Sequence, residues 1–317
     1  MRYQGQAAID FLAAEAAKED PGESSHWRKY HSNFEFTGNG FKGLQGFGGI
    51  ASPYTGLRRW AHLCLQWPFQ RLGLAYPKFR EVDHLAWRLT QQQCRAHDLD
   101  VLRQVLTVSF LHNNLGGRLP PKSTGCVIGD GFATMAALLL GSCTAGKIIL
   151  VNLTKTLLVD LYYLKLFMGE GMFQSSVQLV TDGGRLDEGS FEAAIEQVNE
   201  LKVVAIQASN HELIRNYDID FVVNIASMQE MDPPNILGYF NDMRAIASRR
   251  QLFFYCCNRE EKRLPDGTLT RFAEYPWRSH DHVLVDELCP WHLRYYSFRF
   301  PFYHPYDGAH RHRLVVM

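Results

Sequence analysis

The sequence predicts an α/β protein built around a mostly parallel β-sheet. Five short apolar runs have the composition of strands that are buried on both faces, and helical patterns separate them. A glycine turn, Gly129-Asp130-Gly131, follows the first run and leads directly into an apolar helix start. Alternating strands and helices of this kind form doubly wound sheets. The five runs are residues 126–128, 148–151, 203–206, 221–225 and 252–256.

The first 120 residues are expected to form a helical and loop-rich N-terminal cap, and residues 121–317 the sheet domain. Residues 1–20 have a helical pattern that ends at Asp20-Pro21-Gly22, and residues 57–108 read as two to four further helices. Between them, a loop with seven of the 25 glycines also contains several aromatic residues. Such a loop either folds over a ligand or packs on its own rings.

The remaining elements complete the expected sheet. An insertion after the second run contains an extra strand at 176–180 and a helix at 190–201. Residues 312–317 are expected to form a closing strand, antiparallel to residues 295–300. Five parallel strands and this terminal hairpin give a Rossmann-like sheet of seven strands.

Composition excludes several functional classes. In this chain of 317 residues, 33 basic residues balance 33 acidic ones, so neither nucleic acid nor an anionic membrane is an expected partner. The seven cysteines form no Cys-x-x-Cys pair and are expected to be reduced core thiols. The N-terminus does not resemble a signal peptide and the longest apolar run, 135–140, is too short for a bilayer, which indicates a cytoplasmic protein. The sequence leaves the oligomeric state open, a homo-oligomer included.

The glycine turn predicts a site for an adenosine cofactor. Gly129 and Gly131 allow a strand to turn at once into a helix while the backbone approaches a ligand closely. Enzymes of nicotinamide cofactors have a third glycine three residues after the second, where this chain has Thr134. The spacing, with Ala133 at a small-residue position, favours S-adenosylmethionine instead. Any strand, turn and helix of an α/β protein is the alternative interpretation.

Two positions depart from the usual methyltransferase pattern. An acidic residue is common two positions before the first glycine and at the end of the second strand, where this chain has Val127 and Asn152. The Asn152 amide can accept from one ribose hydroxyl and donate to another, with Leu153 beside it in the donor site. We therefore expect weaker ribose binding or a displaced ribose site.

Polar residues follow the third and fourth strands at the edge where ligands bind in such sheets. Ala208 and Ser209 are candidates for contacts with the adenine ring, and His211 is a candidate base or a solvated loop histidine. Beyond the fourth strand, Ser227 is expected at the donor and Glu230 is the first candidate to deprotonate an acceptor hydroxyl. Alternatively, Glu230 caps the helix that begins near Asp232-Pro233-Pro234.

A later cluster of aromatic and polar residues offers a second set of candidates. Trp277 and Trp291 could stack on a sugar while Arg278 or His292 binds its hydroxyls or a linked phosphate. His282, with its neighbours at 280 and 281, could assist the base or bind a divalent metal. Because no tight metal-ligand spacing recurs, a solvated loop is favoured and no metal is expected.

Several stretches resemble the sugar O-methyltransferase family of bacterial polysaccharide and secondary-metabolite clusters. The similarity extends from about residue 31 to the C-terminus, and its most specific part is Ser227-Met228-Gln229-Glu230-Met231 within residues 221–231. Further matches are Tyr239-Phe240, Phe254-Tyr255, Asn258-Arg259 and Glu261-Lys262.

The resemblance implies a class I S-adenosylmethionine-dependent enzyme that methylates a sugar hydroxyl. It places Gly129, Asp130 and Gly131 at the donor turn, Asn152 at the ribose, and Ser227 and Glu230 in the motif after the fourth strand. Two alternatives remain: a degenerate methyltransferase fold that binds a nucleoside or glycan without turnover, and a methyltransferase for a non-sugar small molecule.

Overall fold

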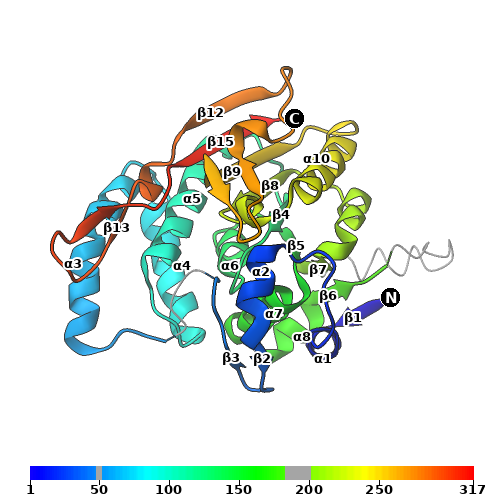
Figure 1. Ribbon diagram of the computed structural model, residues 1–317, viewed down its shortest axis with the longest axis horizontal. Helices are drawn as coiled ribbons and strands as arrows, with labels where there is room; N and C mark the ends of the chain where they lie inside the picture. The colour runs from blue at the N-terminus through cyan, green and yellow to red at the C-terminus, as the bar shows by residue number, and fades with distance from the viewer. Residues whose placement is uncertain (48–51, 183–200) are drawn as a thin grey trace.

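A nine-stranded sheet forms the centre of the protein in the computed structural model, which describes residues 1–47, 52–182 and 201–317 (Figure 1). The strand order is β1-β6-β7-β5-β4-β8-β9-β15-β12, and the six strands from β6 to β9 in this order are parallel. The strands are β1 (Arg2–Gln4), β4 (Thr124–Ile128), β5 (Lys147–Asn152), β6 (Val177–Val180), β7 (Val203–Gln207), β8 (Phe221–Ile225), β9 (Phe253–Arg259), β12 (His282–Leu288) and β15 (His310–Val316).

The predicted Rossmann-like methyltransferase sheet is confirmed, with two strands added at one edge. Leaving out β1 and β6, the order along the sheet is β7-β5-β4-β8-β9-β15-β12, which reverses direction at β4 as in doubly wound folds. The extra strand expected near 176–180 is β6, and β1 pairs with it antiparallel. The helix expected at 190–201 lies outside the described residues, except for its last residue.

The expected partner of the C-terminal strand was wrong. β15 lies between β9 and β12 and is antiparallel to both, whereas residues near 295 form the short hairpin of β13 (Arg294–Tyr296) and β14 (Tyr303–Pro305). Strand patterns reveal which residues alternate between faces but not which strand lies alongside, because pairing is decided by tertiary packing. The other small hairpins are β2 (Glu35–Phe36) with β3 (Phe41–Lys42) and β10 (Glu261–Arg263) with β11 (Leu269–Arg271).

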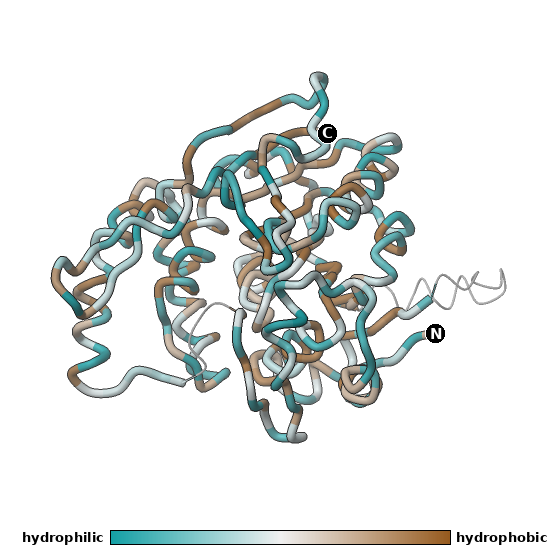
Figure 2. The backbone as a smooth tube through the Cα atoms, viewed as in Figure 1, coloured by the Kyte–Doolittle hydropathy of each residue, from teal (hydrophilic) through white to brown (hydrophobic). Residues whose placement is uncertain are grey.

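Helices cover both faces of the sheet. One hydrophobic cluster joins α1, α4, α5, α6 and α7 to alternate strand residues such as Val127, and a second joins α10 and η3 to the intervening residues such as Cys126. Apolar stretches accordingly run through the central strands in Figure 2. The helices are α1 (Gln6–Glu15), α2 (Ser25–Tyr30), α3 (Gly56–Gly73), α4 (Phe79–Gln92), α5 (Leu99–Leu115), α6 (Thr134–Gly141), α7 (Thr154–Met168), α8 (Glu170–Ser176), α10 (Pro233–Ala247) and the short η1 (His31–Asn33), η3 (Ala208–Asn216), η4 (Met228–Glu230), η5 (Phe272–Glu274) and η6 (Pro290–His292).

The N-terminal 120 residues share a core with the sheet. Helices α3 to α5 occupy the region where two to four helices were expected, and buried residues of α4 and α5 belong to the same cluster as those of α6 and α7. Figure 1 shows α3 and β13 at one end of the molecule and β1 at the other. A domain boundary near residue 120 stays a prediction. Within the described residues, every helix is too short or too polar to cross a bilayer.

Leu150→Ala tests the contribution of the central strands to stability. Leu150 is fully buried in β5, between Val127 of β4 and Ala205 of β7. Truncation should lower the free energy of unfolding by about 2–5 kcal/mol, because it removes buried contacts and leaves a cavity. Urea denaturation measures the change, and Leu57→Ala, at a residue 88% exposed, is the matched control. Equal midpoints for the two variants would contradict this account of the core.

Candidate active site

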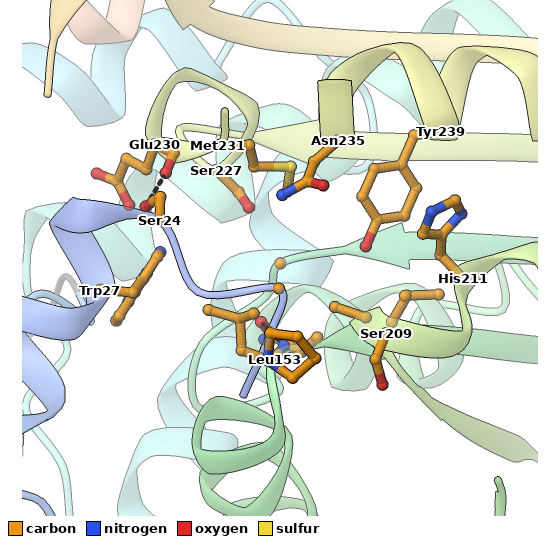
Figure 3. A pocket seen from close by; sticks show the side chains of 16 residues that line it. Ser24, Trp27, Leu153, Ser209, His211, Ser227, Glu230, Met231, Asn235 and Tyr239 are labelled. Atoms are coloured by element: carbon orange, nitrogen blue, oxygen red, sulfur yellow. Dashed lines mark hydrogen bonds between the residues drawn. The ribbon is translucent and has the colours of Figure 1, made fainter. Parts of the chain in front are cut away.

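Two adjoining cavities lie at the carboxyl ends of the parallel strands. The first has a volume of about 230 Å³ and the second about 220 Å³. Figure 3 shows the first cavity with Trp27 and His211 at opposite ends. Because the two cavities share part of their lining, they form one extended cleft suited to an elongated ligand or to two ligands in contact. The shared residues are Trp27, Gly129, Asn152, Ser227 and Glu230.

The glycine turn forms the floor of the cleft. Gly129 and Gly131 have φ of 72° and 76°, which side chains rarely allow. A Cβ on Gly129 would also lie 2.0 Å from Ser227 Oγ. The turn continues through two further left-handed residues, Phe132 and Ala133, before α6 begins. The sequence therefore needs glycine at 129 both for the backbone conformation and for the approach of the segment after β8.

A buried carboxyl group on α7 supports this turn. Asp160 is fully buried, and its Oδ1 accepts a hydrogen bond from the backbone N–H of Ala133 at 2.9 Å. Its Oδ2 accepts from Asn152 Nδ2 at 2.8 Å. Burial, with the neighbouring Asp130, raises the pKa of Asp160 well above its ordinary value. Sequence reasoning missed Asp160, although a single acidic residue within an apolar helical stretch was a signal.

Asp130, predicted at the donor turn, caps the helix that follows the turn, and its contact with a donor stays a prediction. Its two oxygens accept hydrogen bonds from the backbone N–H groups of Met135 at 2.9 Å and Ala136 at 2.7 Å. These groups are unpaired donors in the first turn of α6, so Asp130 caps this helix from one wall of the second cavity. Burial raises the pKa of Asp130 to about 7.

Asn152 and Leu153 line the first cavity, and their contact with a ribose stays a prediction. The side chain of Asn152 already has two partners, since Oδ1 accepts from the Leu153 N–H at 3.0 Å and Nδ2 donates to Asp160. An amide has two N–H groups and two lone pairs, so one donor and one acceptor position remain for a ligand. The missing acidic residue at the end of β5 is therefore only partly compensated.

The N-terminal segment between α1 and α2 covers the first cavity. Asp20 Oδ2 accepts hydrogen bonds from the Thr154 N–H at 2.9 Å and from Thr154 Oγ1 at 2.8 Å, which ties the segment to the start of α7. Ser24 Oγ donates to the carbonyl of Glu230 on the opposite wall. Pro21 and Ser24 of this segment line the cavity, as does Trp27 of the following helix α2. These long-range contacts could not be predicted from the local sequence pattern.

The candidates after β7 also line the first cavity. Ala208 and Ser209 begin η3, directly beyond the carboxyl end of β7. His211 donates from Nδ1 to the fully buried Asp242, which also binds Arg215, and its ring packs against Tyr239 at 4.7 Å. This His–Asp pair fixes the orientation of the imidazole at the end of the cavity farthest from Trp27.

Glu230 lies where the two cavities meet and does not cap α10. Its Oε1 is 3.1 Å from Lys262 Nζ and 3.3 Å from His26 Nε2, so two basic side chains hold the carboxylate. The residue at the N-terminus of α10 is Asp232, and the helix starts at Pro233. Both ion pairs of the Glu230 side chain use Oε1, and within the described part of the chain Oε2 forms no ion pair.

His282 lies away from the cleft. It is the first residue of β12 and pairs with Val316, which pairs with Phe253 at the amino end of β9. The cleft lies at the carboxyl ends of the parallel strands, whereas His282 lies level with their amino ends. Its neighbour Asp281 is engaged by Arg244 and is therefore no ready metal ligand.

Of the two tryptophans expected to stack on a sugar, Trp291 lies in the core and Trp277 is half-buried and packs against it. Trp291 is 1% exposed, and Trp277 packs on Phe240 and Phe254 while its indole N–H donates to a backbone carbonyl. Large aromatic rings are stabilised in an apolar core as well as at a ligand-binding surface, so the sequence alone does not distinguish the two. The tryptophan in the cleft is Trp27, which the sequence did not single out.

The wall of the second cavity opposite the glycine turn is polar and basic. Arg259, at the end of β9, donates from its backbone N–H to Gln229 Oε1 at 2.7 Å and from its guanidinium to Asp307. The Nε of Arg259 is buried, and among the described residues it has no hydrogen-bond partner. Tyr306 and His292 complete this wall, and Phe47 of the glycine-rich loop contributes beside the turn.

Comparison with known proteins gives distant structural likenesses and no match in sequence. No protein-family model and no curated protein matches the chain. Solved structures that resemble it include TrmK of M. capricolum with S-adenosylhomocysteine, at 11% identity and TM-score 0.37, with 65% of this chain and 67% of that one covered. The methyltransferase domain of bacterial CtHen1 is 13% identical with a TM-score of 0.38, and the match covers 69% of this chain and 100% of that one. Magnesium protoporphyrin IX methyltransferase of Synechocystis PCC 6803 with bound SAM is 10% identical with a TM-score of 0.33, and the match covers 68% of this chain and 83% of that one. Substrate and mechanism therefore have to be derived from the cleft.

Asp130 should make stability depend on pH. Its pKa in the folded protein is about 7, against an ordinary value of 3.8, so the folded state retains a proton that the unfolded chain has lost. The stability from this group is complete below about pH 4 and is lost as the pH rises through 7. Asp130→Asn removes this titration, so its free energy of unfolding should fall less between pH 5 and 8 than that of the wild type.

Urea denaturation at several pH values measures this difference. Asp218→Asn, at a side chain 89% exposed, should retain the wild-type dependence and controls for the loss of one carboxylate. The same slope in Asp130→Asn as in the wild type would show that Asp130 is not held protonated.

Proposed function

We propose that the protein transfers a methyl group from S-adenosylmethionine to a hydroxyl oxygen of a sugar or sugar-like small molecule. The observation that carries this proposal is the extended cleft at the carboxyl ends of β4, β5, β7 and β8, where the wall between two cavities bears Glu230. A bipartite donor and an acceptor need such adjoining sites, because the methyl group passes in line from sulfur to oxygen.

The first cavity fits the adenosine part of the donor. Leu153, Ala208 and Tyr239 offer apolar surface for the ring, and Ser209 and Asn235 offer polar groups at its edge. The remaining donor and acceptor positions of Asn152 suit one or two ribose hydroxyls. The bound cofactor would supply an activated methyl group on a positively charged sulfur close to the glycine turn.

The second cavity fits the acceptor. Trp27 and Tyr306 offer ring faces of the kind that pack on sugars, while Gln229 and Arg259 offer hydrogen-bonding groups. The buried Nε of Arg259, without a partner among the described residues, is a donor that a hydroxyl or an anionic group of the acceptor would satisfy. A small polar molecule is favoured over a large polymer because the cavity holds about 220 Å³.

Glu230 is the proposed base. It lies on the wall shared by both cavities, with Oε1 held by Lys262 and His26, so its other oxygen is positioned to accept the hydroxyl proton as the methyl group transfers. His211 lines only the first cavity, and we assign it to the edge of the adenine rather than to proton transfer. His282 has no role in this proposal.

Donor binding tests the first half of the proposal. Calorimetry should detect binding of S-adenosylmethionine and of S-adenosylhomocysteine to the wild type. Ala208→Phe should lower the affinity for both ligands tenfold or more, because the larger side chain fills the cavity proposed for adenosine. Ala13→Phe, on the half-buried side of α1 away from the cleft, is the control for an added ring. Absence of binding at millimolar donor by folded wild-type protein would rule out the methyltransferase proposal.

Glu230→Gln tests the second half. The amide keeps the size of the side chain but cannot take a proton, so turnover should fall by about 10²-fold or more while donor affinity stays within a few-fold. Glu261→Gln, on the exposed hairpin next to Lys262, should leave turnover unchanged. Mass spectrometry of sugars, sugar phosphates and phenols incubated with labelled donor measures the reaction.

Different outcomes separate the alternatives. Wild-type turnover in Glu230→Gln would refute its role as the base, and methyl transfer only to nitrogen would refute the oxygen assignment. Donor binding without transfer to any acceptor in the panel would favour a protein that binds its ligands without turnover.

A further inference from the structure

Three soft metal-binding side chains converge in the core behind the second cavity. Cys257 lies on β9, and Cys289 and His292 lie at the two ends of the Cys-Pro-Trp-His segment that contains η6. One potential ligand atom of each residue lies within 4.8 Å of the other two. Among the described residues this is the one group of three or more such side chains that could hold a metal ion.

The spacing of these atoms matches a tetrahedral zinc site. Nδ1 of His292 is 3.2 Å from Cys289 Sγ and 3.8 Å from Cys257 Sγ. With Zn–S of about 2.3 Å and Zn–N of about 2.0–2.1 Å, the S···N edge of a tetrahedron is about 3.6 Å, between the two observed values. Two thiolates and an imidazole form a donor set that favours zinc over oxygen-seeking cations such as Mg²⁺ and Ca²⁺.

The three residues are buried, so they are shielded from reagents at the protein surface. Both cysteines are fully buried and His292 is 5% exposed. Burial lowers the pKa of His292 well below its ordinary value, so the imidazole is neutral, and raises the pKa of the Cys289 thiol. Metal binding would therefore have to displace thiol protons. The hydroxyl of Tyr255 is hydrogen-bonded to His312 Nδ1 at 3.2 Å, and Cys257 contributes to raising the pKa of Tyr255, so this oxygen also lies near the cluster.

We propose that Cys257, Cys289 and His292 bind one zinc ion, with an oxygen as the fourth ligand. The ion would fasten η6 to the end of β9. This connection matters for the cleft because His292 and Arg259, on these two elements, both line the second cavity. The proposal does not depend on methyl transfer, since its test measures metal binding directly.

Metal analysis tests the site. Protein purified without chelators, or reconstituted with Zn²⁺ alone after reduction, should contain about one zinc per chain. X-ray absorption at the zinc edge should show two sulfur and two lighter ligands. Cys257→Ser and Cys289→Ser should each lower the zinc affinity at least tenfold.

Two control variants separate this cluster from other thiols. Cys256→Ser changes the neighbouring residue on β9, whose side chain packs on the opposite face of the sheet, and should retain zinc. The triple replacement of the exposed Cys64, Cys94 and Cys143 by serine should retain it as well, which excludes adventitious surface binding.

The wild-type protein provides a test that does not depend on folding of the variants. Cobalt titrated into reduced, metal-free protein should give sulfur-to-cobalt charge-transfer absorption, and zinc binding should release about two protons. A folded, reduced protein that takes up neither metal would overturn the proposal. Full zinc content in Cys257→Ser, or a disulfide between Cys257 and Cys289 in the protein as isolated from a reducing cytosol, would overturn it as well.

Discussion

The buried carboxyl group of Asp160 fixes the glycine turn and the end of β5, which border the proposed donor site. It binds the N–H of Ala133, a left-handed residue in the glycine turn, and the amide of Asn152 at the end of β5. Left unpaired in the core, each of these polar groups would cost about 1–3 kcal/mol. Because one side chain connects the two strand ends, the turn and the ribose position are fixed relative to each other by α7. The carboxyl group of Asp160 thus binds the side chain at the end of β5 from behind and does not itself line either cavity.

Closure of the cleft depends on contacts between distant parts of the chain. Asp20 is bound to Thr154, and Ser24 is bound to Glu230, so the segment that precedes α2 bridges the two walls of the first cavity. Trp27 follows on this segment and lies against both cavities. The N-terminal residues therefore build part of the site as well as part of the core.

The local elements of the fold could be predicted from sequence, whereas the long-range contacts could not. The apolar runs and the glycine turn are encoded by neighbouring residues, and they occur as β4, β5, β7, β8, β9 and the start of α6. The same reasoning placed Asn152, Ala208, Ser227 and Glu230 at one edge, because parallel strands end together. It could not find Trp27, whose position depends on closure across more than 100 residues. It also misplaced Trp291, because a ring in the core and a ring at a ligand have the same local pattern.

The two cavities share Gly129 of the glycine turn but differ in much of their lining. The first cavity, the proposed donor site, is lined by residues that follow β5, β7 and β8 and by the N-terminal segment. The second cavity, the proposed acceptor site, is lined by the glycine turn, β8 and the segment after it, and by α5, Arg259 and His292. Arg103 donates to the carbonyl of Trp291 and so ties α5 to η6. Side chains on α5 and η6 can change without disturbing the backbone of the glycine turn. In the proposed function, such changes would alter the acceptor site more than the donor site, whereas the residues that line both cavities, Glu230 above all, would have to suit both ligands.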